Sequence, residues 1–148
     1  MILVLKKYRF IVATLVFALI ILAVIIGLFS IDSATNRMVC EYVESLGWEI
    51  NSSPVEISHL AIPREFDAVY ETYNAVQKSS GFDLTPFRGK SVARYSYRVL
   101  NHKQSETTEV IVSVFVYDKR IIAADICSTD SNGFMHGITE TVNIKSDN

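Results

Sequence analysis

Three residues near the end of the chain have side chains that could carry nucleophilic catalysis: Asp125, Cys127 and His136. A thiol becomes a nucleophile when a nearby base removes its proton, and a histidine oriented by a carboxylate can act as that base. Asp125 and Cys127 lie two positions apart in a predicted strand, so they share one face of it. Because no spacing brings His136 to that face, we favour a structural interpretation: a buried aspartate that caps the turn at 133–137, a packed cysteine and a loop-closing histidine.

The three histidines, His59, His102 and His136, do not form a metal-binding pattern. Histidine ligands on one helix fall four residues apart and those on one strand two apart, and no pair here has either spacing. The chain also has no phosphate-binding loop, because Gly-Lys-Ser at 89–91 lacks the upstream glycine that such a loop requires. We therefore expect neither a metal nor a cofactor.

Four basic residues surround the start of a predicted strand: Arg88, Lys90, Arg94 and Arg98. Arg94 and Arg98 fall on one face of that strand, where they could form a stripe that binds an anionic ligand. A solvated sheet face is the interpretation that we favour.

Charge is distributed unevenly along the chain. Three of its 14 basic residues, Lys6, Lys7 and Arg9, precede residue 10, whereas all 16 acidic residues follow residue 31. The part after residue 31 therefore holds 11 basic against 16 acidic residues, a formal charge of −5. Since nucleic acids attract positively charged proteins, this sign argues against a nucleic-acid partner.

The longest apolar run, residues 10–31, has no charged side chain. At about 1.5 Å per residue a helix of this length spans about 33 Å, which matches the hydrocarbon core of a bilayer. The apolar part of a secretory signal is shorter, so we favour an uncleaved anchor over a cleaved signal or a buried core helix. Because Lys6, Lys7 and Arg9 precede the run, the positive-inside rule places the N-terminus in the cytoplasm.

Two segments after residue 31 have the periodicity of helices. Apolar residues recur at helical spacing in 38–46, where polar residues at 32–36 offer N-caps and Gly47 a left-handed C-cap. In the second segment, 66–79, one helical face carries Phe66, Val69, Tyr70, Tyr73 and Val76.

The period changes to two in the C-terminal half. Residues 91–100 alternate between apolar and polar, 110–117 are apolar on both faces and therefore central, and 120–127 follow a turn at Asp118–Lys119. A further strand within 55–62 is bounded by prolines, which suits a sheet edge.

The elements predict an α+β fold in which one N-terminal transmembrane helix precedes a small domain. In that domain two helices pack on one face of a three- to four-stranded, mainly antiparallel sheet. The predicted organisation is a cytoplasmic N-terminus (1–9), a transmembrane helix (10–31), an extracytoplasmic domain (32–138) and a tail or short edge strand (139–148). Cys40 and Cys127 could form a disulfide in that compartment, but the spacing leaves the pairing open, and we favour two buried thiols.

Several short motifs resemble one family of bacterial proteins. They are Leu46-Gly47-Trp48-Glu49-Ile50, Ile62-Pro63-Arg64-Glu65-Phe66, Tyr73-Asn74, Gln77-Lys78, Gly81-Phe82-Asp83-Leu84, Pro86-Phe87-Arg88-Gly89-Lys90, Arg94-Tyr95-Ser96-Tyr97, Asp125-Ile126-Cys127-Ser128 and Gly133-Phe134-Met135-His136-Gly137. Over about residues 40–138 the chain resembles domain of unknown function 4830, which implies a small domain behind one membrane helix, mostly in Gram-positive bacteria, and implies no reaction.

The chain departs from the family's pattern at two places. It has Asp118-Lys119 where the family tends to have Asp-Gly, and Ala123-Ala124 where a Gly-Gly pair tends to stand. A lysine with positive φ costs about 1 kcal/mol relative to glycine, so we expect a different turn type or slight strain at Lys119.

Two functions are compatible with these features. The favoured one is a membrane-tethered, extracytoplasmic binding module, held close to the bilayer, with an envelope protein as partner. The alternative is a cell-envelope enzyme that uses Cys127, His136 and Asp125.

Overall fold

The computed structural model describes residues 2–130 and 133–145, with the side chains of 14–23, 33–130, 133–141 and 143–145. The chain forms two compact units, Met1–Thr35 and Asn36–Asn148. The first belongs to helix α1, Ile2–Ser45, whose last turns belong to the second unit. Among the described side chains, no helix is both long and apolar enough to cross a membrane. Of the predicted span 10–31, residues 10–13 and 24–31 lie outside those side chains.

Helix α1 is continuous through 32–36, so the predicted helix start in that segment is wrong. The segment contains neither proline nor glycine, and the cost of its polar residues inside a helix is small. Tertiary contacts in the second unit also hold Asn36: its Oδ1 accepts from the Tyr97 hydroxyl at 2.8 Å, and its Nδ2 donates to the Ser52 carbonyl at 3.2 Å.

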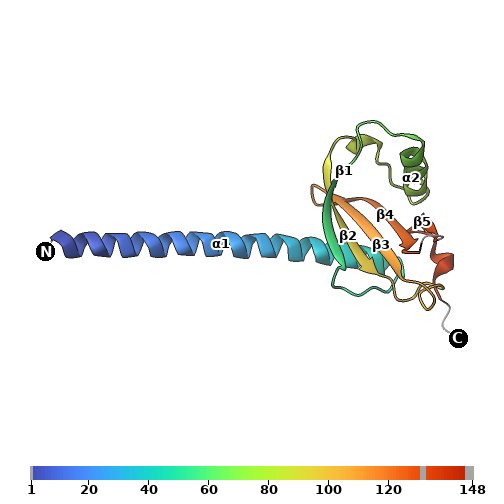
Figure 1. The fold of residues 1–148 in the computed structure, drawn as a ribbon. Coiled ribbons are helices and arrows are strands. Elements are labelled where there is room, and N and C mark those ends of the chain that lie inside the picture. The colour runs from blue at the N-terminus through green and yellow to red at the C-terminus, as the bar shows by residue number, and fades with distance from the viewer. Residues whose placement is uncertain (1, 131–132, 146–148) are drawn as a thin grey trace. The chain divides into compact units, whose positions relative to one another are not determined.

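The second unit is built on a five-stranded antiparallel sheet with strands in chain order (Figure 1). The strands are β1 (Glu56–Ala61), β2 (Ser91–Arg98), β3 (Val110–Tyr117), β4 (Arg120–Ser128) and β5 (Met135–Gly137). The α+β prediction is confirmed, whereas the three to four strands were too few. Strand β5 is only three residues long, which is too short for alternation to identify it, and the residues expected to form an edge strand carry the 3₁₀ helix η2 (Thr141–Asn143).

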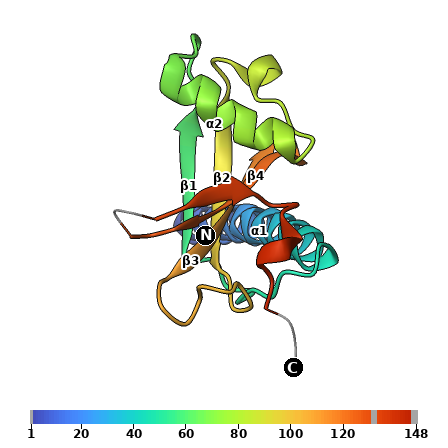
Figure 2. The ribbon, with the colours of Figure 1, turned by 90° about the vertical axis from the view of Figure 1, so that its right-hand side faces the viewer.

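Helix α2 (Ala68–Ser79) and the 3₁₀ helix η1 (Thr85–Phe87) lie between β1 and β2 in the chain. The side chain of Asp67 accepts a hydrogen bond from the Tyr70 amide at 2.8 Å and so caps α2. Figure 2 shows α2 lying across the end of the sheet at which β1 ends.

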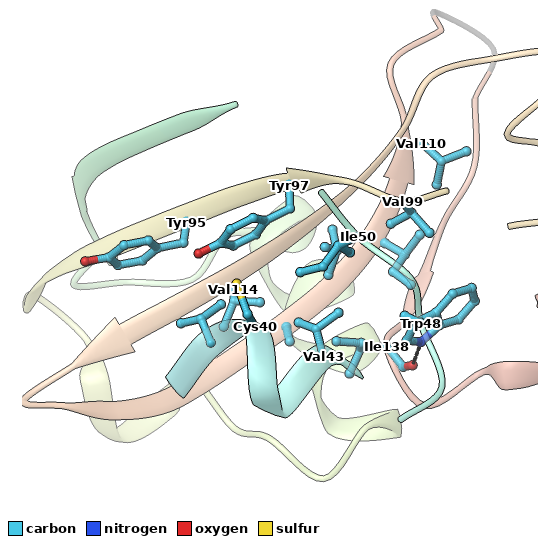
Figure 3. Close-up of a cluster of buried hydrophobic side chains, with 14 of the residues drawn as sticks. Cys40, Val43, Trp48, Ile50, Tyr95, Tyr97, Val99, Val110, Val114 and Ile138 are labelled. Atoms are coloured by element: carbon cyan, nitrogen blue, oxygen red, sulfur yellow. Dashed lines mark hydrogen bonds between the residues drawn. The ribbon is translucent and has the colours of Figure 1, made fainter. Parts of the chain in front are cut away.

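The two faces of the sheet have separate apolar cores. The α1-side core contains Val39, Cys40, Val43, Trp48, Ile50, Tyr95, Tyr97, Val99, Val110, Val112, Val114, Val116, Ala124, Ile126 and Ile138 (Figure 3). The α2-side core contains Ile62, Leu84, Val92, Phe115, Ile122 and Ala123, with Tyr70 and Tyr73 packed against it.

The prediction that both helices cover one face is therefore wrong. In β3 the residues Val112 and Val114 face α1, while Phe115 faces Tyr73 of α2 with ring centroids 6.3 Å apart. A strand that is apolar on both faces needs cover on both, and the end of α1 and α2 each supply one side.

The hairpin between β3 and β4 has two non-glycine residues in the left-handed region. Asp118 has φ 46° and Lys119 φ 60°, as a two-residue type I′ turn requires. The expected strain at Lys119 is thus present. Near this turn the pairing of β3 with β4 is irregular between Phe115 and Val116, where β4 has one extra residue, as in a β-bulge.

Candidate functional site

The most buried acidic side chain of the sheet, Asp125, is held by two residues of α2. Its Oδ2 accepts from the Tyr73 hydroxyl at 2.6 Å and from Gln77 Nε2 at 2.9 Å. Tyr73 and Gln77 are four residues apart and therefore share one helical face. Gln77 Oε1 also accepts from the Ala124 amide at 2.9 Å, so α2 is tied to both the side chain and the backbone of β4.

Burial dominates the electrostatics of this group. Asp125 is 2% exposed, and desolvation raises the pKa of its carboxyl although the bonds from Tyr73 and Gln77 favour the charged form. Burial, followed by the charge of Asp125, also raises the pKa of Tyr73. The neutral hydroxyl of Tyr73 therefore donates to the buried carboxyl of Asp125, and this hydrogen bond joins α2 to the sheet.

Cys127 lies on the same face as Asp125, as the alternation of the strand predicts. Burial raises the pKa of its thiol, and the neighbouring Asp125 raises it further, while Arg94 opposes both. A nucleophilic cysteine needs the opposite shift, because the thiolate is the reactive form. The environment of Cys127 thus does not activate it.

His136 projects from the other face of the sheet. It is paired with Ile126 across β4 and β5, and Ile126 belongs to the α1-side core. The structure therefore brings Asp125 and Cys127 together but separates both from His136, and the three do not form a catalytic arrangement. Cys40 and Cys127 are free thiols that belong to opposite faces in the same way.

A second histidine, His102 in the loop between β2 and β3, lies against His136. The two Nε2 atoms are 3.3 Å apart, and the rings are inclined by 21°. Trp48 and Phe134 stack on the pair, with centroid distances of 5.9 Å from Trp48 to His102 and 4.7 Å from Phe134 to His102. Sequence reasoning missed this cluster, because its members are far apart in the chain and follow no periodic pattern.

The third histidine, His59, is exposed on β1, at the opposite edge of the sheet from β5. Within the described residues no group of three or more histidine, cysteine or acidic side chains could hold a metal ion.

The basic stripe is largely neutralised by carboxylates. Arg94 binds Glu56 at 3.1 Å, Arg98 binds Glu109, and Arg88 binds Glu71 at 3.4 Å while its guanidinium lies 4.2 Å from the centre of the Phe66 ring. Lys90 is exposed. Since each arginine has a carboxylate partner, the three arginines do not present free positive charge to an anionic ligand.

Strand β1 forms one edge of the sheet and pairs with β2. The Ile62 amide donates to the Lys90 carbonyl at 2.9 Å, which fixes the even-numbered residues as those that exchange hydrogen bonds with β2. The backbone groups of Ile57, His59 and Ala61 consequently point away from the sheet. Ile57 is 40% exposed and Val55, just before the strand, is 52% exposed.

Comparison with known proteins gives one result. The family model for Domain of unknown function (DUF4830) matches residues 42–126, from the last turn of α1 into β4. No match was found among curated proteins, and none among solved structures.

Proposed function

The chain belongs to the DUF4830 family, and on that premise we propose that it is a membrane-tethered, extracytoplasmic module that binds an envelope protein through the open edge of β1. The uncharged apolar run at 10–31 supplies the tether, and the bases at Lys6, Lys7 and Arg9 keep the N-terminus inside. The folded unit then lies outside the membrane. The proposal needs no catalytic group, which agrees with the separation of Cys127 from His136.

The observation that carries the binding role is the edge of β1. The outward amides and carbonyls of Ile57, His59 and Ala61 can pair with an extended segment of a partner, which would add a sixth strand to the sheet. Val55 and Ile57 offer apolar contact beside that strand. Natural sheets commonly protect such an edge with charge or proline. Here proline stands only at the flanks, Pro54 and Pro63, and the charged residue of β1, Glu56, is paired with Arg94 of β2.

The tether is tested by expression with a C-terminal reporter in a bacterial host. The proposal predicts a chain that stays in the membrane through a carbonate wash and is digested by protease added to intact cells stripped of their wall. Release of the reporter into the medium, or its protection from protease, contradicts the proposed anchor or its orientation.

The edge is tested with a photoreactive amino acid at position 57 in intact membranes, and with the same amino acid at Val69 as the matched control. Val69 is 78% exposed and belongs to α2, which is not a strand of the sheet. We expect one discrete adduct from position 57, none from position 69, and loss of the adduct in His59→Pro, which removes an outward amide but no bond to β2. Equal labelling at both positions contradicts binding at the edge of β1. An adduct of twice the chain's mass means that the bound partner is a second copy of this chain.

A further inference from the structure

The pair formed by His102 and His136, here called the histidine latch, joins the loop between β2 and β3 to strand β5. Both rings are buried, with 2% of His102 and 9% of His136 exposed. Each ring nitrogen has a partner. His102 Nδ1 accepts from the Gln104 amide at 3.1 Å, the two Nε2 atoms meet at 3.3 Å, and His136 Nδ1 lies 2.9 Å from the Gly137 carbonyl oxygen.

The ends of this chain of hydrogen bonds determine where the protons lie. It begins at a backbone N–H, which only donates, and ends at a carbonyl oxygen, which only accepts. His102 Nδ1 is therefore bare, His102 Nε2–H donates to His136 Nε2, and His136 Nδ1–H donates to Gly137. Two ring protons satisfy all three hydrogen bonds, and two neutral histidines carry two ring protons.

A third proton cannot be added without loss. On His136 Nε2 it would face the N–H of His102, and on His102 Nδ1 it would face the N–H of Gln104. Exchanging tautomers moves the conflict from one contact to the other and does not remove it. The network is complete only while both imidazoles are neutral.

We propose that the histidine latch is an acid-sensitive switch: it fastens the C-terminal segment 133–145 to the loop at 100–104 when neutral, and it releases that segment from the loop when the pair takes a proton. Other contacts also hold the segment: β5 pairs with β4, Ile138 is fully buried in the α1-side core, and the Lys145 amide donates to the Asn101 carbonyl at 2.8 Å. Trp48 Nε1 donates to the Ile138 carbonyl at 2.7 Å, the Lys103 amide donates to the Asn143 carbonyl at 2.8 Å, and His102 forms an isolated bridge with Ile144. This inference does not depend on the role proposed for β1.

The charged groups around the latch act in different directions. They are Lys103, Asp125, Glu140, whose Oε1 accepts from the Gly137 amide at 3.2 Å, and the Lys145–Glu106 ion pair. Burial lowers the pKa of His102, and the charges of His136 and Lys103 lower it further. The geometric conflict at His136 Nε2 does not depend on any of these charges.

The sign of the pH dependence follows from the lowered pKa. The unfolded or released segment binds a proton at about pH 6.5, whereas the fastened latch resists it. The contribution of His102 to the latch is therefore complete above about pH 6.5 and is lost as the pH falls through its lowered pKa, by up to about tenfold in the release equilibrium per pH unit.

Asp125 cannot produce the same loss. Its pKa is raised in the fold, so acidification favours the folded state at that position. The carboxyls whose pKa is lowered, Asp83 and Glu106, lose their contribution only below their ordinary range near pH 4. A transition between about pH 6.5 and 4.5 consequently reports the histidines.

The fluorescence of Trp48 tests the switch, because it is the chain's single tryptophan, it stacks on His102, and its ring centroid lies 6.1 Å from that of His136. Full-length protein in detergent micelles with EDTA is titrated from neutral to acid, and the same is done for His102→Gln, His136→Gln and the matched control His59→Gln at the exposed third histidine. We expect a transition centred below pH 6.5 in the wild type and in His59→Gln. It should be absent from both latch variants.

Nitrogen NMR of the wild-type protein measures the tautomer of each histidine directly, so it tests the proposal even if a latch variant fails to fold. At neutral pH we expect His102 protonated at Nε2 and His136 at Nδ1, and amide exchange of 136–144 should accelerate below the transition. Opposite tautomers, an unchanged transition in both latch variants, or a wild type whose fluorescence and amide exchange stay constant down to about pH 4.5 would overturn the switch.

Discussion

The hydroxyl of Tyr73 donates a 2.6 Å hydrogen bond to the buried carboxylate of Asp125. Gln77, one turn further along α2, donates to the same oxygen at 2.9 Å. Asp125 and its two donors therefore form one of the polar links between α2 and β4, beside the bond from the Ala124 amide to Gln77 Oε1.

Replacing Tyr73 by phenylalanine removes one donor from a buried acceptor. We expect Tyr73→Phe to lower the free energy of unfolding by about 1–3 kcal/mol, measured by urea denaturation at neutral pH. Tyr70→Phe is the matched control, because the Tyr70 hydroxyl makes no hydrogen bond within the described part of the chain, and it should change stability by less than about 0.5 kcal/mol. Equal effects of the two variants would mean that the bond contributes nothing.

Asp125→Asn keeps an oxygen acceptor for Tyr73 and Gln77 but removes the cost of burying a charge. Because the pKa of Asp125 is raised in the fold, the wild type bears this cost at neutral pH and sheds it as the pH falls towards the ordinary value of 3.8. The stability of the Asp125→Asn variant relative to wild type should therefore decrease on acidification, by at most about 1.4 kcal/mol per pH unit. If urea titrations of the two proteins give a stability difference that does not change with pH, the pKa of Asp125 is not raised in the fold.

The raised pKa of Cys127 predicts that its thiol reacts slowly with alkylating reagents. Native protein treated with a maleimide near neutral pH should label poorly, while urea should expose both cysteines to rapid reaction, as followed by intact mass. Cys127→Ser identifies which thiol any native label occupies. Rapid stoichiometric labelling of Cys127 in the folded state would support the enzyme alternative.

Lys119 is held in a left-handed conformation that glycine adopts freely. We expect Lys119→Gly to stabilise the second unit by about 1 kcal/mol, less the larger entropy of glycine in the unfolded chain, and Lys119→Ala to give no gain. Urea midpoints measured on the three proteins distinguish these outcomes. A loss of stability in Lys119→Gly would show that the lysine side chain holds the turn.

Much of the fold could be predicted because its signals are local. The alternation in 91–100, the apolar runs in 110–117 and 120–127 and the turn between those runs predicted β2, β3 and β4 as an antiparallel meander. The helical spacing from Phe66 to Val76 predicted α2. The apolar residues on both faces of β3 also indicated that the two helices lie on opposite faces of the sheet. A strand apolar on both faces requires two covers, and the assignment of both helices to one face overlooked that requirement.

The candidate site was less predictable, since each of its decisive relations joins distant residues. Alternation placed Asp125 and Cys127 on one face, but only the register of β5 against β4 placed His136 on the other. The carboxylate partners of the arginines depend likewise on strand pairing, as in Arg94 with Glu56 across β1 and β2.

The sequence by itself determined most of the longer elements, the uncharged apolar run and the absence of a recognisable catalytic or metal motif, because periodicity, charge and motif spacing are properties of neighbouring residues. Tertiary structure alone decided which face each element covers and which polar groups meet. The 3.3 Å contact between His102 and His136 depends on two loops and a three-residue strand, whose positions are fixed by packing against Trp48 and not by any local preference.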